Sequence, residues 1–233
     1  MINAALEMLL LQSPPLFHFW GGRQQVGFVR PQVDLLNKCI AGLPSGAPRF
    51  AMETGAGIST LWLLNHGFDV VSFCLSQEVA DRMNAFLMEY PEIRSQWNVT
   101  IGYSELTLPA HVLSARARQA SLCLIDGGHG VQTVFADFVY LNYLLIDGGF
   151  LLVDDVQLPG PKLLNLLLQL NAGFSLYGAT RKLQAYRTLP GRKRLLEGNQ
   201  KPLAAKISEA FGVSNIQEPS KKPDDTCNSP DPE

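Results

Sequence analysis

The sequence predicts an α/β protein, doubly wound around a mostly parallel, seven-stranded sheet with an antiparallel final hairpin. From residue 49 onwards, short apolar runs alternate with longer runs whose apolar residues recur at helical spacing. Strands and helices that alternate in this way build parallel sheets with helices on both faces, so each strand is apolar along its whole length. The length of 233 residues suits one such domain with additions.

Residues 1–48 are expected to form an N-terminal helical and lid segment. The stretch MINAALEMLLLQSPP indicates a short amphipathic helix and not a signal peptide, because it has no early Lys or Arg and Glu7 interrupts its apolar residues. Residues 13–32 are rich in aromatics, Gly and Pro, which leaves two interpretations: a packed connector, or a lid that lines a pocket. Residues 31–41 predict a helix with Pro31 in its first turn.

The core domain is expected to span residues 49–190. Its five parallel strands are predicted at residues 49–54, 68–75, 97–104, 120–126 and 149–156. Its helices are predicted at residues 59–67, 76–91, 131–145 and 161–173. Residues 174–178 and 182–189 can pair as the antiparallel hairpin. Ligands of such sheets bind beyond the carboxyl ends of the strands, which is where the informative side chains fall.

The C-terminal part of the chain is expected to add little to this core. Residues 191–217 indicate a helical extension that is interrupted near Pro202. Residues 218–233 contain several prolines and almost no apolar side chains, so they cannot bury enough surface to become ordered. We therefore expect a disordered tail after the extension.

Composition and charge narrow the classes of partner. The formal net charge is -2 and the pI is near 6.1, which lacks the basic surplus of a general nucleic-acid binder. No uninterrupted apolar run approaches the roughly 18 residues that span a bilayer, so we expect neither nucleic acid nor a membrane as a partner. The four cysteines form no CxxC pair, which indicates a reducing, cytoplasmic location and argues against a disulfide framework or a zinc site. A homo-oligomer remains an open alternative.

The stretch FAMETGAGIST at residues 50–60 puts an acid at the end of a strand and two glycines in the turn before a helix. Such glycines let a ligand approach N–H groups at a helix N-terminus, although a tight turn without a ligand would look the same. A dinucleotide site is one alternative, but Thr60 stands where it needs a third glycine. It also needs an acid after the second strand, where Cys74 stands and Glu78 is the nearest carboxylate. Glu53 would repel a pyrophosphate and suits a cationic ligand such as S-adenosylmethionine, which has a sulfonium and an ammonium group.

ETGAGIST at residues 53–60 resembles the first motif of the class I S-adenosylmethionine-dependent methyltransferases. IDGGH at residues 125–129, then Asp137, then LLIDGGFLLVDDV at residues 144–156 resemble the later motifs of that superfamily, in the same order. The resemblance covers about residues 49–187 and is closest to the small O-methyltransferases related to catechol- and macrocin-type enzymes. It implies a Rossmann-like methyltransferase fold, S-adenosylmethionine as cofactor and a small-molecule acceptor.

The resemblance also implies which residues hold the cofactor. The methionine end would be held by Glu53, Gly55 and Gly57, and the helix beneath it would begin with Ser59 and Thr60. The ribose and adenine would lie against Cys74, Leu75 and Ser104, and Asp126 completes the predicted set. The family usually has an acid after the second strand that accepts both ribose hydroxyls. This chain lacks it, so either Glu78 reaches back or ribose binding is weaker.

The strand order that the resemblance implies makes the strands before Asp126 and before Asp154 and Asp155 neighbours, so these three carboxylates are expected to converge. Hard oxygen donors suit Mg²⁺, and the resemblance implies these three residues as its ligands. The metal would bind two vicinal oxygens of the substrate and lower the pKa of a hydroxyl. The alternative is a set of acids without a metal, in which Asp155 caps the next turn.

His129 lies in a glycine-flanked loop and is the predicted general base, with Asp126 beside it in the catalytic set. The matching position in catechol-type enzymes carries a basic residue. A cofactor contact, a substrate contact or a helix cap are the other roles open to His129. Asp137 is expected on a solvated helix face or in an ion pair.

Two other groups of residues carry weaker signals. We assign no role to the remaining histidines, His18, His66 and His111. The N-terminal aromatics and a nearby arginine either line an acceptor pocket or belong to the core: Phe17, Phe19, Trp20 and Arg30.

The sequence therefore predicts a methyltransferase that uses S-adenosylmethionine on a small molecule, at a hydroxyl oxygen, with Mg²⁺ as an open addition. Methyl transfer requires positioning of donor and acceptor but no covalent nucleophile, and no nucleophile motif is evident. The alternatives are an NAD(P)-dependent oxidoreductase on a similar sheet and a non-catalytic methyltransferase-like binding protein.

Overall fold

The structure is a computed structural model that describes residues 2–15, 17–20, 23–25, 28–114 and 116–192. The predicted C-terminal extension lies outside the described residues except for its first two positions, and the predicted disordered tail lies wholly outside them.

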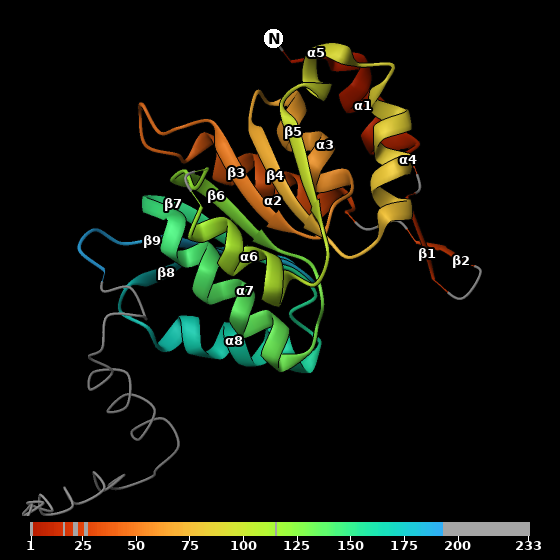
Figure 1. The fold of residues 1–233 in the computed structure, drawn as a ribbon. Coiled ribbons are helices and arrows are strands. Elements are labelled where there is room, and N and C mark those ends of the chain that lie inside the picture. Colours follow the sequence, from red (N-terminus) through yellow and green to blue (C-terminus); the bar gives the residue numbers. More distant parts are fainter. Residues whose placement is uncertain (1, 16, 21–22, 26–27, 115, 193–233) are drawn as a thin grey trace, which may run out of the picture. The chain divides into compact units, whose positions relative to one another are not determined.

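Seven strands form one sheet in the order β5-β4-β3-β6-β7-β9-β8 (Figure 1). Their bounds are Phe50–Thr54 for β3, Asp69–Cys74 for β4, Trp97–Ile101 for β5, Ala120–Ile125 for β6, Leu145–Val153 for β7, Phe174–Ala179 for β8 and Gln184–Thr188 for β9. The first five strands in this order are parallel, β9 is antiparallel to β7, and β8 is antiparallel to β9. The predicted fold class and its final hairpin are confirmed.

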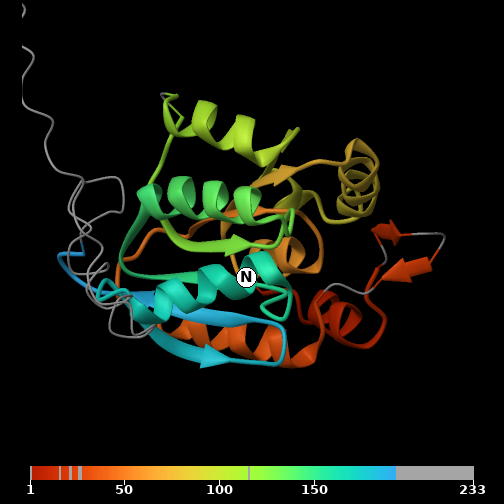
Figure 2. The same ribbon diagram turned by 90° about the horizontal axis from the view of Figure 1, so that it is seen from below.

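Helices cover both faces of this sheet, as Figures 1 and 2 show. Their bounds are Ala4–Gln12 for α1, Arg30–Ala41 for α2, Ile58–Asn65 for α3, Gln77–Leu87 for α4, Pro91–Arg94 for α5, Ser104–Val112 for α6, Val131–Leu144 for α7 and Pro159–Leu170 for α8. Apolar residues of α1 to α4 pack into one core layer, and those of α6, α7 and α8 into the other. None of the helices in the described ranges is long and apolar enough to cross a bilayer.

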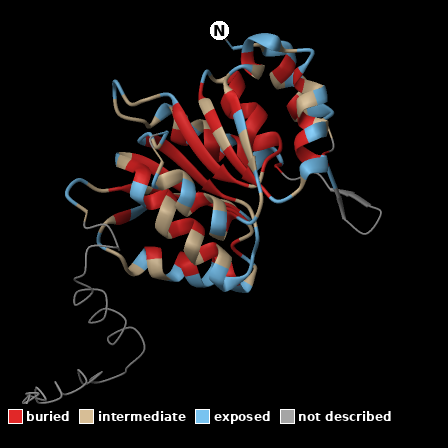
Figure 3. Cartoon of the chain, viewed as in Figure 1, coloured by how far each residue is buried: buried red, intermediate tan, exposed pale blue. Residues whose placement is uncertain are grey.

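The central strands are apolar on both sides because each side meets a helical layer. Every residue of β3 and of β6 is buried, whereas the edge strand β5 is partly exposed. Figure 3 shows the same contrast between the buried middle of the sheet and its edges. The carboxyl ends of β3, β6 and β7 therefore meet at the middle of one edge of the sheet.

Three local features differ from the sequence predictions. Ser104 begins helix α6 and does not end a strand. The sequence analysis missed this helix because Pro109, a residue that is unfavourable inside helices, lies within it. Strand β7 begins at Leu145, before the glycine pair, and its register against β6 shifts there. A two-stranded ribbon, β1 (His18–Trp20) paired antiparallel with β2 (Arg23–Gln25), lies within the stretch interpreted as connector or lid.

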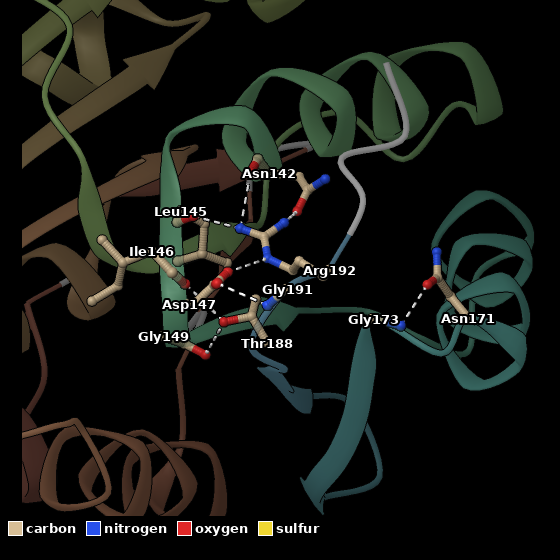
Figure 4. Close-up of polar contacts among 10 residues, drawn as sticks. All are labelled: Asn142, Leu145, Ile146, Asp147, Gly149, Asn171, Gly173, Thr188, Gly191 and Arg192. Atoms are coloured by element: carbon tan, nitrogen blue, oxygen red, sulfur yellow. Dashed lines mark hydrogen bonds and ion pairs between the residues drawn. The ribbon is translucent and has the colours of Figure 1, made fainter. Parts of the chain in front are cut away.

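Arg192 anchors the end of the described chain to the junction between α7 and β7 (Figure 4). Its side chain is only 2% exposed, and Nε lies 3.4 Å from Asp147 Oδ1. The guanidinium donates to Asn142 Oδ1 and to the backbone carbonyl oxygens of Asn142 and Leu145. Gly191 N also donates to Asp147 Oδ2 at 3.1 Å. A cation at the C-terminus of α7 satisfies carbonyls that the helix leaves unpaired and interacts favourably with its dipole.

Candidate active site

The carboxyl ends of β3, β6 and β7 bring three predicted site residues together: Glu53, Asp126 and Asp154. In the sheet Thr54 pairs with Ile125, and Ile125 pairs with Val153, so the residues beside them fall at one level. Burial raises the pKa of Asp126, and the charges of Asp154 and Glu53 raise it further. We call these three residues the acid cluster.

Glu53 is completely buried, and hydroxyl groups surround its carboxylate. Ser59 Oγ donates to it at 3.0 Å, Ser72 Oγ at 2.7 Å, and Thr60 Oγ1 through a further short hydrogen bond. Burial raises the pKa of Glu53 to about 7, against the lowering effect of the three hydroxyls. In this conformation Glu53 can therefore act on a ligand through its charge, while Ser59 and Thr60 hold its carboxylate.

The two glycines of the turn, Gly55 and Gly57, differ in backbone conformation and in the groups that surround them. Gly55 has φ +88°, and a Cβ there would collide with the carbonyl oxygen of Asp126. The crossing of two loops therefore requires glycine, whether or not a ligand binds. Gly57 has extended backbone, and a Cβ there would lie 3.4 Å from His18 Nε2.

His18 is a site residue to which the sequence analysis gave no role. Its Nε2 lies 2.8 Å from the carbonyl oxygen of Ala56, in the middle of the glycine turn. The ribbon that carries His18 is also tied to α4, because Arg82 Nη1 donates to the carbonyl oxygen of Phe17 at 2.7 Å. The N-terminal segment therefore contacts the turn directly.

Asp126 and Asp154 are neighbouring acids, and the charge of Asp154 acts on Asp126. Burial, and then the charges of Asp154, Asp155 and Glu53, hold the pKa of Asp126 well above its usual range. Asp154 Oδ1 also accepts from Gln32 Nε2 at 3.0 Å.

Gln32 is the second site residue that the sequence analysis missed. It is buried at the start of α2, and its Oε1 accepts from Val29 N at 3.0 Å. Both ends of the amide are therefore fixed, and α2 is linked to the acid cluster.

The side chain of Asp155 is held by basic residues. Its oxygens lie 3.3 Å from His129 Nε2 and 3.5 Å from Lys182 Nζ. Its φ of +48° is uncommon for a residue other than glycine, and it lets neighbouring carboxylates take different directions. In the part of the chain that the structure describes, no group of three or more His, Cys, Asp or Glu side chains is arranged to hold a metal ion.

His129 is partly exposed, with a side chain 37% accessible, and it faces Asp155. The loop that carries it is fixed by α8, because a Cβ at Gly160 would collide with the carbonyl oxygen of His129. The sequence-predicted base therefore has both a carboxylate partner and a supported backbone.

The predicted adenosine side of the site lies at the ends of β4 and β5. Cys74 is buried, and its thiol donates to the carbonyl oxygen of Ser76 at 3.5 Å, whereas Leu75 is 61% exposed. Glu78 is paired with Arg82 on α4, so in this structure it does not reach back to replace the missing acid.

Asp137 departs from its prediction. It is fully buried within α7, so the expectation of a solvated face or an ion pair is wrong. The reason is its place on the inner side of the helix, level with the buried residues Val134, Phe138 and Leu141. The Ser104 hydroxyl faces it from the start of α6.

The N-terminal aromatics and Arg30 separate into different classes. Phe17 is buried in the core beside Phe86, which supports the core interpretation for this residue. Arg30 is exposed and lies 4.0 Å from Asp34. The side chains of Phe19 and Trp20 lie outside what the structure describes.

A cavity of about 480 Å³ lies at the opposite edge of the sheet, where the parallel strands begin. It is lined by the end of α2, the loop at residues 42–49 and His66. Predicted catalytic and cofactor residues are absent from its lining, so it is separate from the candidate site.

Comparison with known proteins agrees with this geometry. Residues 52–156 match a family model described as a methyltransferase domain. No curated protein sequence matches the chain significantly. The family resemblance predicted from the sequence is confirmed.

Solved structures share the fold at low sequence identity. The O-methyltransferase TomG from Streptomyces achromogenes, which is involved in tomaymycin synthesis and was crystallised with S-adenosylmethionine, is 15% identical with a TM-score of 0.56, covering 70% of this chain and 82% of that one. The O-methyltransferase NovP is 13% identical with a TM-score of 0.57, covering 74% and 86%. An rRNA methylase from Streptococcus thermophilus is 14% identical with a TM-score of 0.53, covering 70% and 99%. Because these proteins act on different acceptors, the shared fold does not select one.

Proposed function

This chain carries a methyltransferase domain at residues 52–156, and on that premise we propose that it transfers the methyl group of S-adenosylmethionine to a hydroxyl oxygen of a small molecule. The cofactor would lie over the turn at residues 55–57 and beside Asp126. Its ribose and adenine would lie toward Cys74, Leu75 and Ser104.

The acid cluster is the observation that carries this proposal. Burial raises the pKa of Glu53, of Asp126 and of Asp154, and neighbouring carboxylates raise the last two further. Carboxylates that are crowded and desolvated in this way gain from a nearby cation. The sulfonium and ammonium groups of S-adenosylmethionine provide that charge, whereas the pyrophosphate of a dinucleotide would add to the repulsion.

The proposed reaction is a direct displacement. The hydroxyl oxygen of the acceptor attacks the methyl carbon in line with sulfur, so the C–O bond forms as the C–S bond breaks. The bonding electrons stay on sulfur, which becomes the neutral thioether of S-adenosylhomocysteine. The site contributes by holding the reacting atoms at attack distance and by excluding water.

His129 would take the proton that the acceptor loses. If Nε2–H donates to Asp155, the lone pair of the neutral ring is on Nδ1, and the proton would move there. Asp155 would then orient the ring and stabilise the imidazolium as it forms.

The predicted magnesium site does not fit the donor arrangement in this conformation. Asp154 is engaged by Gln32, and Asp155 is engaged by His129 and Lys182. We therefore assign no step to a metal. Asp126, Asp154 and Asp155 stay as the predicted ligand set, for which activity with and without a chelator is the test.

The proposal is tested by incubating the full chain with methyl-labelled S-adenosylmethionine and a panel of catechols, phenols and hydroxylated sugars. Formation of S-adenosylhomocysteine and of a labelled product is measured. With a productive acceptor, His129→Ala should lower the rate about 100-fold and leave the affinity for S-adenosylhomocysteine within about twofold. Asp155→Asn should lower the rate by a smaller factor, because it removes the orienting charge but keeps the base.

His111→Gln, on α6, is the matched histidine control and should keep the wild-type rate. Weaker cofactor affinity in His129→Ala at an unchanged rate would make His129 a binding residue. Cofactor binding without turnover on any acceptor would favour the non-catalytic alternative. Turnover that stops when a chelator is added would support the predicted metal site.

A further inference from the structure

Asp137 is a buried acid for which the reaction has no use. It is 0% exposed on the inner side of α7, yet neither of its carboxylate oxygens has a hydrogen-bond partner among the described residues. Buried polar groups in folded proteins are nearly always hydrogen-bonded, and an unpaired carboxylate is among the most costly exceptions. Packing alone therefore does not account for an acid at this position.

Two hydroxyls face the carboxylate without completing a hydrogen bond. One belongs to Thr54 at the end of β3 and the other to Ser104 at the start of α6. Burial raises the pKa of Asp137 to about 6, against the lowering effect of these two hydroxyls, and the charge of Glu105 adds to the rise. Thr54 Oγ1 also lacks a hydrogen-bond partner within the described residues.

This group lies directly behind the proposed cofactor site. Thr54 precedes the glycine turn, and a Cβ at Gly127 would lie 3.1 Å from Thr54 Oγ1. Ser104 is 8% exposed and stands where the adenine is expected. Both hydroxyls are therefore candidate hydrogen-bond donors to the Asp137 carboxylate.

A hydroxyl group can donate one hydrogen bond and accept others through its lone pairs. Once Ser104 donates its proton to a buried carboxylate, it presents only lone pairs to a neighbouring ligand. It then accepts an N–H and repels a carbonyl oxygen. Asp137 is fully buried, so an effect of its carboxylate on recognition would pass through Ser104.

We propose that Asp137 is a positioning residue that fixes the Ser104 hydroxyl as a hydrogen-bond acceptor, so that the site selects the 6-amino group of adenine. The inference rests on the proposed function, which places the adenine beside Ser104. It assigns a purpose to a buried acid that the displacement step does not need, and it makes Ser104 a specificity-determining residue.

The test compares two ligands by calorimetry on the full chain. S-adenosylhomocysteine carries the 6-amino group, and S-inosylhomocysteine has a carbonyl oxygen in its place. The wild-type chain should prefer the adenine ligand about tenfold, because the other ligand sets a carbonyl oxygen against lone pairs. Asp137→Asn should reduce the preference to about twofold, because the amide can donate to Ser104 and release its proton toward the ligand.

Ser104→Ala should reduce the preference equally, and the double variant should show no further loss, because both changes remove one interaction. Asp69→Asn, at the opposite edge of the sheet, is the matched control and should keep the wild-type preference. Loss of stability without loss of preference would give Asp137 a structural role only and overturn the inference.

The inference is also overturned if the wild-type chain does not distinguish the ligands, or if the two single-variant effects multiply. Should Asp137→Asn fail to fold, Ser104→Ala alone decides. An unchanged preference for the adenine ligand in that variant would show that the Ser104 hydroxyl is not the acceptor, and it would overturn the inference. Binding of S-adenosylhomocysteine in any of these cases leaves the proposed function standing. A wild-type chain that binds neither ligand overturns the proposed function and the inference together.

Discussion

Two regions of the molecule treat buried charge in opposite ways. At the carboxyl edge of the sheet, the acid cluster gathers like charges, and burial and these charges hold the pKa of Asp126 well above its usual range. At the amino edge, Arg192 is buried to a similar degree, but its donors meet Asn142, Leu145 and Asp147 (Figure 4). The charge of Arg192 is compensated by the protein, whereas that of the acid cluster is not.

The difference indicates where stability and function are separated in this fold. A buried charge with complete partners stabilises the structure around it, and removing one partner is costly. Crowded carboxylates lower stability until a cation binds, and natural proteins keep such destabilising arrangements at functional sites. Mutations in the two regions should therefore change stability in opposite directions.

The largest effect is expected at the compensated charge. Arg192→Ala should lower the free energy of unfolding by about 3–5 kcal/mol, because it leaves buried carbonyl oxygens at the end of α7 without donors. Thermal unfolding followed by circular dichroism should shift down by roughly 10 °C. Arg118→Ala removes an exposed ion pair with Asp69 and is the matched control, with a cost of at most about 1 kcal/mol.

A mutation of Arg192 should not change the cofactor site, which lies at the other edge of the sheet. Arg192→Ala should therefore bind S-adenosylhomocysteine with wild-type affinity below its melting temperature. A variant that keeps full stability, or that loses cofactor affinity, would show that the two regions are not separate.

The next effect has the opposite sign. In the unfolded chain Glu53 ionises near 4.5, and in the folded protein its pKa is raised to about 7. The stability from its bound proton is therefore complete below pH 4.5 and is lost as the pH rises toward 7, a difference of about 3 kcal/mol. Glu53→Gln should raise the melting temperature of the ligand-free protein at about pH 8, and it should weaken the binding of S-adenosylmethionine.

A pH series on both proteins checks this directly. The wild-type contribution should decline between these two pH values, and the Glu53→Gln protein should lack that decline. Equal pH profiles, or a Glu53→Gln protein that is both less stable and unchanged in affinity, would mean that Glu53 carries no uncompensated charge.

The smallest expected effect is a proton released on binding. A cation beside the acid cluster lowers raised carboxyl pKa values, so cofactor binding near pH 7 should release about half a proton. Its affinity should increase with pH across neutrality. Calorimetry in two buffers with different ionisation enthalpies measures the release, and identical heats in both would contradict it.

The parts of this fold that follow a local pattern, or the motif order of the resembled superfamily, could be predicted from sequence. Asp126 and Asp154 were expected to meet because the strand order of that superfamily makes the strands before them neighbours, and β6 and β7 do pair in that way. The hairpin was expected because two alternating runs flank a short turn, and β8 and β9 form it.

The features that could not be predicted from sequence depend on contacts between distant segments or on a single backbone angle. His18 and Gln32 reach the site from the N-terminal segment, 38 and 122 residues away from their partners along the chain. No spacing rule links residues so far apart. The direction of the Asp155 side chain depends on a positive φ angle at that residue, which the neighbouring residues in the sequence do not predict.

Asp137 is different, because a signal for it was present. It lies three residues after Val134 and four before Leu141, both buried, so helical spacing places it on the apolar face. An acid on an apolar face is a stronger pointer to function than an acid in a helix as such.

The central claim is that the acid cluster recognises a cationic sulfur donor, and calorimetric titration of the full chain with S-adenosylmethionine, S-adenosylhomocysteine and NADH tests it most directly. The account predicts saturable binding of both sulfur ligands at about one per chain, with no heat from NADH. Heat from NADH alone, or from none of the three, would contradict it.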